Sequence, residues 1–261
     1  MTETQIENLM PEQLTVVKNP VGAEAIKFAH YLDAKTRSVP GKRSGRRTRL
    51  KLMAATSLLL EEDTFENMNV IDICNQADVA KGTFYLQFST KEDVIHAILE
   101  EYVEFEIRTM PLLQQSSDPF ETIFSFVSWY EQTFRTNAGI MRNFVRMSDH
   151  DSGIAELWKR RNEQIVERTM QTYMQHSDFN SNDVESARLM VRTMGGILDY
   201  SLFARAGINQ SSDFTEGTSD GLLIELHALL IYRGLYGKDP SEQSLSRRVQ
   251  GFAAGGRRNK K

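Results

Sequence analysis

A single cysteine, Cys74, is present among the 261 residues, so the chain has no internal disulfide. This excludes the disulfide-stapled class of small secreted domains and is consistent with a reducing compartment. Apolar residues three and four positions away place Cys74 on the inner face of a short helix. We expect it to act there as a small core hydrophobe.

Long hydrophobic runs are also missing. Residues 1–8 lack the basic and apolar regions of a signal peptide, and the most apolar late segment, 222–232, is interrupted by Glu225 and His227. We therefore expect neither secretion nor a membrane span, and we expect the protein in the cytoplasm. Hydrophobic residues still make up 40% of the chain, which is enough to bury the cores of two domains.

Recognisable catalytic and metal-binding patterns are absent as well. The five histidines are scattered, and there is no HExxH, no GxSxG and no phosphate-binding glycine loop. The segment Met147–Asp151 groups a histidine with two carboxylates and a serine, but it precedes Gly153 as a turn between helices would. We predict that the protein is not an enzyme and has no catalytic residues, no metal site and no cofactor.

Helical periodicity runs through most of the chain from Arg46 onward, and no alternating apolar runs with hairpin turn signals are present. The fold class is therefore predicted to be all-α. We expect a mostly disordered extension over 1–42, with a short helix possible over 23–32, and a flexible basic tail over 239–261. Between them we place a helix-turn-helix domain (43–92) and a larger helical regulatory and dimerisation domain (93–238).

Charge is distributed unevenly along the chain, although the formal net charge is only −4. Eight basic residues and no acid lie between Asp33 and Glu61, and six more, again without an acid, lie in the last fifteen residues. The remainder is strongly acidic. A basic stretch beside a helix-turn-helix favours contact with a polyanion, whereas the alternative is a solvated linker; for the basic tail both interpretations stay open.

The stretch 68–91 has the outline of a helix-turn-helix. Asn69 precedes a short apolar-periodic helix as an N-cap, and Ala77-Asp78 supply a tight turn. A second helix then begins near Ala80 with Phe84 and Phe88 packing inward. The outer side of this helix is predicted to expose a glycine and four hydrogen-bonding side chains suited to phosphates and base edges: Lys81, Gly82, Thr83, Tyr85 and Gln87.

The following helix can start from Ser89 or Thr90, since each has an acidic residue three positions later. Lys91 then lies at a helix N-terminus, where a cation is mildly unfavourable. Its presence there fits a phosphate docked on the same amide groups, and the alternative is a solvated lysine.

The run from Arg46 to Val103 resembles the DNA-binding domain of the TetR family of bacterial transcriptional repressors. Residues 47–60 are similar to the family's first helix, Phe65 to its aromatic residue before the second, and 79–91 to its signature. The resemblance implies that Tyr85 and Lys91 contact phosphates while Lys81, Thr83 and Gln87 face the major groove or its rim. The complete set of expected DNA contacts is Arg46, Arg47, Asn69, Lys81, Gly82, Thr83, Tyr85, Gln87 and Lys91.

Several positions depart from the family pattern. Asp78 stands where the family usually has glycine, Ala80 where it has serine or threonine, and Gln87 where it has histidine. The first two weaken the turn and the cap. Ile71 occupies a position where some members have a base-reading arginine, so the sequence preference of the family does not transfer.

Aromatic residues and methionines are frequent in the second domain, where they are predicted either to form core or to line an adaptable apolar pocket. The resemblance implies that a ligand chamber exists there. The candidate ligand contacts are Trp129, Phe144, Trp158, Tyr173 and Met194.

Two late helices, over 183–206 and 216–236, carry wide apolar faces, and the first contains Gly195-Gly196. Close approach of two backbones would explain the glycines, which each cost roughly 1 kcal/mol in a helix relative to alanine. The resemblance implies that these helices form a four-helix bundle across a two-fold axis. The alternative is a helical hairpin within one chain.

Together these features predict a homodimeric, ligand-responsive transcriptional regulator, a repressor, that acts at the nucleoid. It would bind double-stranded DNA at a palindromic operator and be released by an apolar small-molecule effector. The alternative is a regulator of the same fold controlled by a protein partner or by its own basic tail, with no small ligand.

Overall fold

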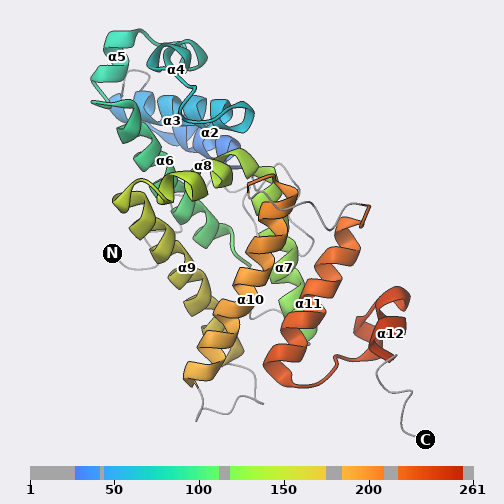
Figure 1. Cartoon of the computed structure of the whole chain (residues 1–261). Helices are drawn as coiled ribbons and strands as arrows, with labels where there is room; N and C mark the ends of the chain where they lie inside the picture. The colour runs from blue at the N-terminus through green and yellow to red at the C-terminus, as the bar shows by residue number, and fades with distance from the viewer. Residues whose placement is uncertain (1–26, 42–43, 112–117, 175–183, 209–216, 255–261) are drawn as a thin grey trace, which may run out of the picture. The chain divides into compact units, whose positions relative to one another are not determined.

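The computed structural model describes residues 27–41, 44–111, 118–174, 184–208 and 217–254. These ranges contain helices and turns but no strand, which confirms the all-α prediction (Figure 1). The chain falls into two compact units. The first comprises the chain up to Arg108 together with Thr136–Ile154, and the second comprises Thr109–Arg135 and the chain from Ala155 onward.

The first unit is built around the helices of the predicted helix-turn-helix. Its elements are α2 (Phe28–Ser38), α3 (Gly45–Glu62), α4 (Val70–Ala77), α5 (Lys81–Tyr85), nearly all of α6 (Lys91–Thr109) and α8 (Ala138–Ser148). Apolar faces of these helices supply the core, and in α3 and α6 the buried residues recur at three- and four-residue spacing. The core residues include Leu52, Leu60, Ile73, Phe84, Val94, Ile98 and Tyr102.

Helix α2 lies within the extension that the sequence predicts to be mostly disordered. It begins and ends later than the short helix predicted over 23–32, and its residues Phe28 and Leu32 are completely buried. The Phe28 ring meets the edge of Tyr102 on α6 at a centroid distance of 5.3 Å. Such a short helix has little stability alone, so packing against α6 explains why it forms.

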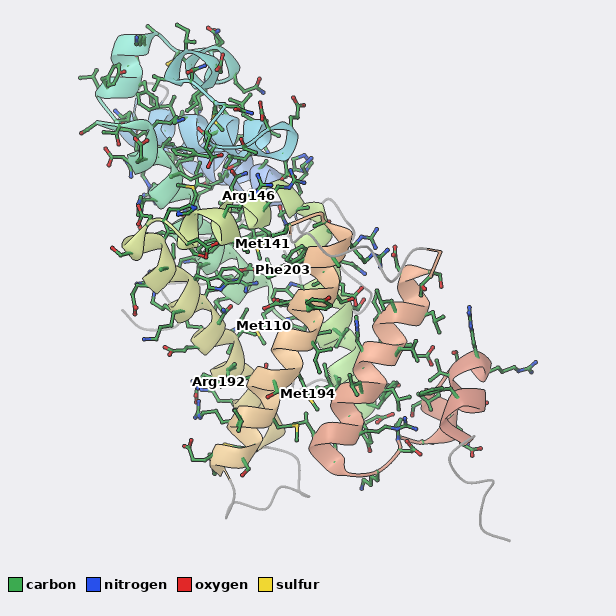
Figure 2. All side chains as sticks on the ribbon, viewed as in Figure 1. Met110, Met141, Arg146, Arg192, Met194 and Phe203 are labelled. Carbon is green, nitrogen blue, oxygen red and sulfur yellow. The ribbon has the colours of Figure 1, made fainter. Side chains whose placement is uncertain are left out.

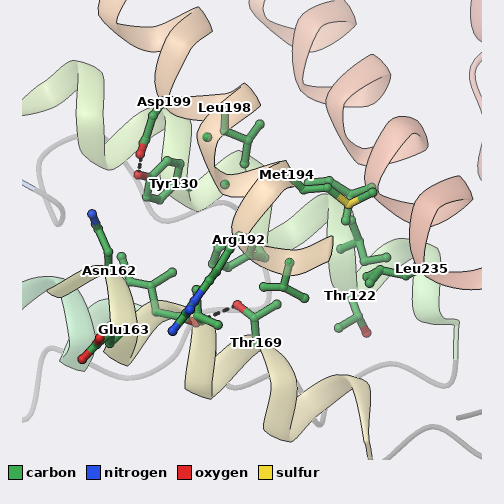
Figure 3. Close-up of a pocket in the computed structure, with 18 of the residues that line it drawn as sticks. Thr122, Tyr130, Asn162, Glu163, Thr169, Arg192, Met194, Leu198, Asp199 and Leu235 are labelled. Carbon is green, nitrogen blue, oxygen red and sulfur yellow. Dashed lines mark hydrogen bonds between the residues drawn. The ribbon is translucent and has the colours of Figure 1, made fainter. Parts of the chain in front are cut away.

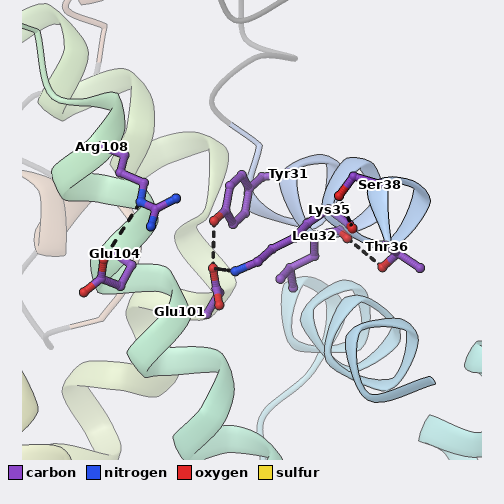
Figure 4. A network of polar contacts seen from close by, with 8 residues as sticks. All are labelled: Tyr31, Leu32, Lys35, Thr36, Ser38, Glu101, Glu104 and Arg108. Carbon is purple, nitrogen blue, oxygen red and sulfur yellow. Dashed lines mark hydrogen bonds and ion pairs between the residues drawn. The ribbon is translucent and has the colours of Figure 1, made fainter. Parts of the chain in front are cut away.

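A polar network adds to this packing (Figure 4). The Tyr31 hydroxyl donates to Glu101 Oε1 at 2.7 Å, and Lys35 forms an ion pair with the same carboxylate. Burial, followed by the hydrogen bond to Glu101, raises the pKa of the Tyr31 phenol well above its ordinary value. The network therefore holds α2 on α6 with the phenol protonated.

Helix α8 packs closely against α3. A Cβ atom added at Gly139 would lie 2.2 Å from the backbone oxygen of Leu60, so only glycine fits this contact. Asn143 Oδ1 accepts a hydrogen bond of 2.8 Å from the backbone N–H of Phe65. These contacts group α8 with α3 in the first unit, whereas the boundary predicted at residue 92 places it in the second domain.

The second unit is a separate helical assembly. It contains α7 (Pro119–Thr136), α9 (Ser152–Tyr173), α10 (Val184–Arg205), α11 (Asp220–Tyr236), the 3-10 turn η2 (Glu242–Ser244) and α12 (Arg247–Ala254), apart from the ends of α7 and α9 that fall in the first unit. Figure 2 shows Arg192, Met194 and Phe203 along α10 of this unit. Within this core, buried Glu131 on α7 accepts a hydrogen bond from His227 on α11 at 2.7 Å if Nδ1 carries the proton.

The segment before the C-terminus is ordered up to Ala254, in contrast to the flexible tail that the sequence predicts from residue 239. Glu225 Oε1 accepts a hydrogen bond from the backbone N–H of Ser246, and Ser244 Oγ donates to Asp118 Oδ2 at 2.8 Å. Val249 is buried. Buried apolar and polar contacts thus fix a short helix that Gly251 disfavours, while 255–261 lie outside the described residues.

Candidate nucleic-acid interface

Asn69 is the N-cap of helix α4, as predicted. The backbone of Asn69 is extended, and its N–H donates to Asp72 Oδ2 at 2.9 Å. This contact satisfies one N–H at the helix start and places a carboxylate at the positive end of the helix dipole.

The turn between α4 and α5 passes through Asp78, which has left-handed backbone angles of φ 51° and ψ 55°. Among the described residues it is the only non-glycine with positive φ. Asp tolerates this conformation at some cost, which fits a position where the family usually has glycine. Cys74 on α4 is buried below the turn, and burial raises the pKa of its thiol, so it acts as a core residue.

Helix α5 exposes the face that the sequence assigns to DNA. Phe84 and Phe88 are buried and anchor the helix and the turn after it, while Lys81, Gly82 and Tyr85 are exposed and Thr83 is half-buried. A Cβ added at Gly82 would meet nothing within 4 Å among the described residues. The backbone at Gly82 is therefore open to close approach from outside.

Lys91 contacts protein atoms, whereas the sequence suggested either a lysine beside a docked phosphate or a solvated lysine. Its Nζ donates to the backbone oxygens of Phe65 at 2.8 Å and Met68 at 2.9 Å, and it lies 4.2 Å from the centroid of the Phe65 ring. The ammonium group therefore holds the loop between α3 and α4. In this arrangement its donors are directed at protein carbonyls.

Arg47 and Arg49 are also engaged within the first unit. Arg47 Nη2 donates to the backbone oxygen of Val39 just after α2. Arg49 Nη1 donates to the Gln87 backbone oxygen at 2.8 Å, and its guanidinium lies 4.0 Å from the centroid of the Phe88 ring. The sequence identifies Arg49 only as part of a basic stretch, since its partner is distant in the chain.

Three predicted DNA contacts remain, and they differ in exposure. Arg46 and Asn69 are exposed, and Gln87 is half-buried with its side chain near Gly45.

The start of α6 uses Thr90, whose backbone N–H donates to Asp93 Oδ2 at 3.0 Å. The same carboxylate also accepts from the Ser89 N–H at 2.9 Å.

A second candidate site is a partly open cavity of about 580 Å³ lined by residues of α7, α9, α10 and α11, here called the effector cavity (Figure 3). Of the five predicted ligand contacts, Trp158 and Met194 line it. Trp129 is buried in the same unit but does not line the cavity. Lining residues that the sequence does not single out as ligand contacts include Thr122, Phe126, Tyr130, Arg192 and Leu235.

The other two predicted ligand contacts are Phe144 and Tyr173. Phe144 belongs to the first unit and is completely buried there, so it is a core residue. Tyr173 ends α9, and its side chain lies outside the described residues. Helical spacing alone identifies a buried face, but it does not say whether core atoms or a cavity face it.

Helices α10 and α11 retain exposed apolar side chains within the described chain. The side chains of Leu189, Tyr200 and Leu230 are 66%, 51% and 45% exposed. A Cβ added at Gly195 or Gly196 would meet nothing within 4 Å, so no close backbone approach within the described part of one chain accounts for these glycines.

The histidine-containing segment before Gly153 forms the turn between α8 and α9. Asp151 Oδ1 accepts from the Ile154 N–H at 3.0 Å, and this bond, followed by the contact with His96, lowers the pKa of Asp151. Within the described ranges no cluster of histidine, cysteine and acidic residues could hold a metal ion, and no helix combines the length and apolarity needed to cross a bilayer.

Comparisons with known proteins agree with this geometry. Residues 52–98 match the family described as bacterial regulatory proteins, tetR family. A search of curated proteins finds no match.

Among solved structures, the chain is similar to a TetR-family transcriptional regulator from Streptomyces coelicolor, with a TM-score of 0.58 and 10% identity over 72% of this chain and 79% of that one. It is also similar to the TetR family transcriptional regulator PfmR from Thermus thermophilus, with a TM-score of 0.51 and 16% identity over 70% and 98% of the two chains. The chain therefore carries the helix-turn-helix DNA-binding domain of the TetR family of bacterial regulatory proteins and has the all-helical fold of TetR-family transcriptional regulators.

Proposed function

We propose that this DNA-binding regulator is a homodimeric repressor that binds a palindromic operator and is released by an apolar small molecule. The observation that carries the proposal is α5, which is anchored by Phe84 and Phe88 and exposes Lys81, Gly82 and Tyr85. Lysine, threonine and tyrosine donors suit phosphates and base edges, and Gly82 leaves room for a phosphate backbone.

The short length of α5 favours a dimer. Helix α5 has only five residues, and one copy would read one half-site. Two copies related by a two-fold axis would read half-sites about 34–36 Å apart, or a multiple of that distance. The exposed apolar residues of α10 and α11 support a dimer through 183–206 and 216–236.

The effector cavity supports control by a small molecule over control by a protein partner. Its volume of about 580 Å³ lies within the range of roughly 300–1,000 Å³ that is typical of small-molecule sites. A ligand that fits only one arrangement of the dimer would shift the population able to bind DNA. The proposed regulator has no catalytic activity and no cofactor, and it acts in the cytoplasm.

The test is selection of genomic DNA fragments by the purified full-length protein at near-physiological salt, followed by sequencing. A palindromic motif supports the proposal, whereas salt-sensitive binding without sequence preference contradicts it. The variant Lys81→Ala/Tyr85→Phe should bind the selected site at least tenfold more weakly. Arg160→Ala, which removes one exposed positive charge on α9, is the control and should leave the affinity nearly unchanged.

A further inference from the structure

We propose that the effector cavity takes an elongated apolar molecule with an anionic head group, such as a carboxylate, and that Arg192 binds the head group. The inference rests on the proposed function, because it names the ligand class of the cavity assigned there to the effector.

The walls of the cavity suit an alkyl chain. Apolar side chains from α7, α9, α10 and α11 line it, among them Ile123, Phe126, Val166, Leu198, Ile231 and Leu235. Figure 3 shows the side chain of Arg192 extending to the left, away from Met194 and Leu235. An apolar chain with one polar end matches this separation.

Arg192 is the charged residue best placed for the head group. It is exposed on α10, lines the cavity and has no hydrogen bond or ion pair with any residue that the structure describes. Figure 3 shows its side chain extending from α10 toward α9, beside Thr169. A guanidinium group presents paired N–H donors that match the two oxygens of a carboxylate.

The other charges on the lining are less suited to a ligand. Asp199 accepts a hydrogen bond from the Tyr130 hydroxyl, and Lys159 lies 3.9 Å from Glu156. The Glu163 carboxylate points away from the other drawn side chains (Figure 3). Of the two basic residues on the lining, Arg192 is therefore the one that pairs with no acidic residue in the described chain.

Thr122 supplies an independent indication that the cavity has an occupant. Its side chain is more than nine-tenths buried and lines the cavity, and its hydroxyl oxygen has no hydrogen-bond partner in the described part of the chain. Buried hydroxyl groups are normally paired, so a ligand oxygen or a water held beside the ligand would complete this site.

The test uses three probes of equal chain length below their micelle concentrations: dodecanoate, dodecan-1-ol and dodecyltrimethylammonium. Binding to the full-length protein is followed by tryptophan fluorescence, since Trp158 lines the cavity and Trp129 is the only other tryptophan. We expect dodecanoate to bind at least tenfold more tightly than the alcohol. Shortening the acid should weaken binding by about fourfold per methylene.

The variant Arg192→Gln should remove the preference for the acid over the alcohol. Arg188→Gln is the matched control, because Arg188 lies one turn earlier on α10, pairs with Glu167 and does not line the cavity. It should keep the preference. Equal affinity for all three probes, or a preference for the ammonium probe that Glu163→Gln removes, would overturn the assignment.

Operator binding measured with each probe separates this inference from the proposed function. If dodecanoate binds in an Arg192-dependent way without changing operator affinity, the ligand class stands and the effector role fails. If no probe binds while the palindromic operator is still recognised, the ligand class fails and the DNA-binding function stands.

Discussion

The Lys91 ammonium group and the Phe65 backbone oxygen are 2.8 Å apart, although the two residues are separated by 26 positions in the chain. The same ammonium group lies over the Phe65 ring. The N–H of Phe65 in turn donates to Asn143 on α8. Phe65 is therefore held from two sides, by the start of α6 and by α8, within the first unit.

Replacing Lys91 with methionine should destabilise the protein by about 1.5–3 kcal/mol, because charge-assisted hydrogen bonds to the buried loop carbonyls are lost. Urea unfolding measures this change. Lys81→Met is the matched variant on exposed α5. It should change stability by less than about 0.5 kcal/mol but lower the salt dependence of operator binding by about one unit of slope. Equal stability of the two variants would contradict the role assigned to Lys91.

Gly139→Ala should destabilise the first unit by about 1–3 kcal/mol or more, since the new Cβ would lie 2.2 Å from the Leu60 oxygen and the backbone must move. Thermal unfolding followed by circular dichroism measures the effect. Gly251→Ala on α12 is the control, because a Cβ there meets nothing within 4 Å in the described chain. It should be neutral or stabilise by up to about 1 kcal/mol. A neutral Gly139→Ala variant would show that α8 does not pack on α3 this closely.

His227→Leu should cost about 3–5 kcal/mol, because it leaves the completely buried Glu131 carboxylate without its partner at 2.7 Å. Adding Glu131→Leu should recover much of that loss, which a double-mutant cycle by urea unfolding measures. The exposed pair Asp33 and Arg37 is the comparison, and its coupling should be below about 1 kcal/mol. Additive effects of the two buried substitutions would argue against the pair.

Tyr31→Phe should change how stability depends on alkaline pH. Since burial and Glu101 raise the pKa of the folded-state phenol, the unfolded chain loses this proton first as pH rises above about 10. Stability that is present below pH 10 is then lost, at up to about 1.4 kcal/mol per pH unit from this group. Urea unfolding at pH 8 and pH 11 should therefore show a smaller loss in the variant than in the original protein. An identical loss in both would exclude Tyr31 as the source.

The helix-turn-helix was predictable because its determinants are local. The cap at Asn69, the turn at Asp78 and the inward spacing of Phe84 and Phe88 each involve residues within a few positions of one another. Such features depend on backbone conformation and helical period, which sequence encodes directly. The exposed face of α5 follows from them, since burying two phenylalanines orients the rest of the helix.

Roles that depend on distant partners were not predictable. Lys91 is engaged by carbonyls 23 and 26 residues earlier, and Arg47 and Arg49 are engaged by backbone oxygens that no local pattern identifies. Helices α2 and α12 form because they are packed against other helices. The weak periodicity of such short segments does not predict that packing.

The sequence by itself therefore determined the fold class, the helix-turn-helix domain and the exposed face of α5. Only the tertiary structure decided which cations remain available, that Phe144 is core while Trp158 and Met194 line a cavity, and that Arg192 stands at that cavity. The physical reason is that the period of apolar residues determines which side of a helix is buried. Which residues pack against that side depends on contacts between segments far apart in the chain.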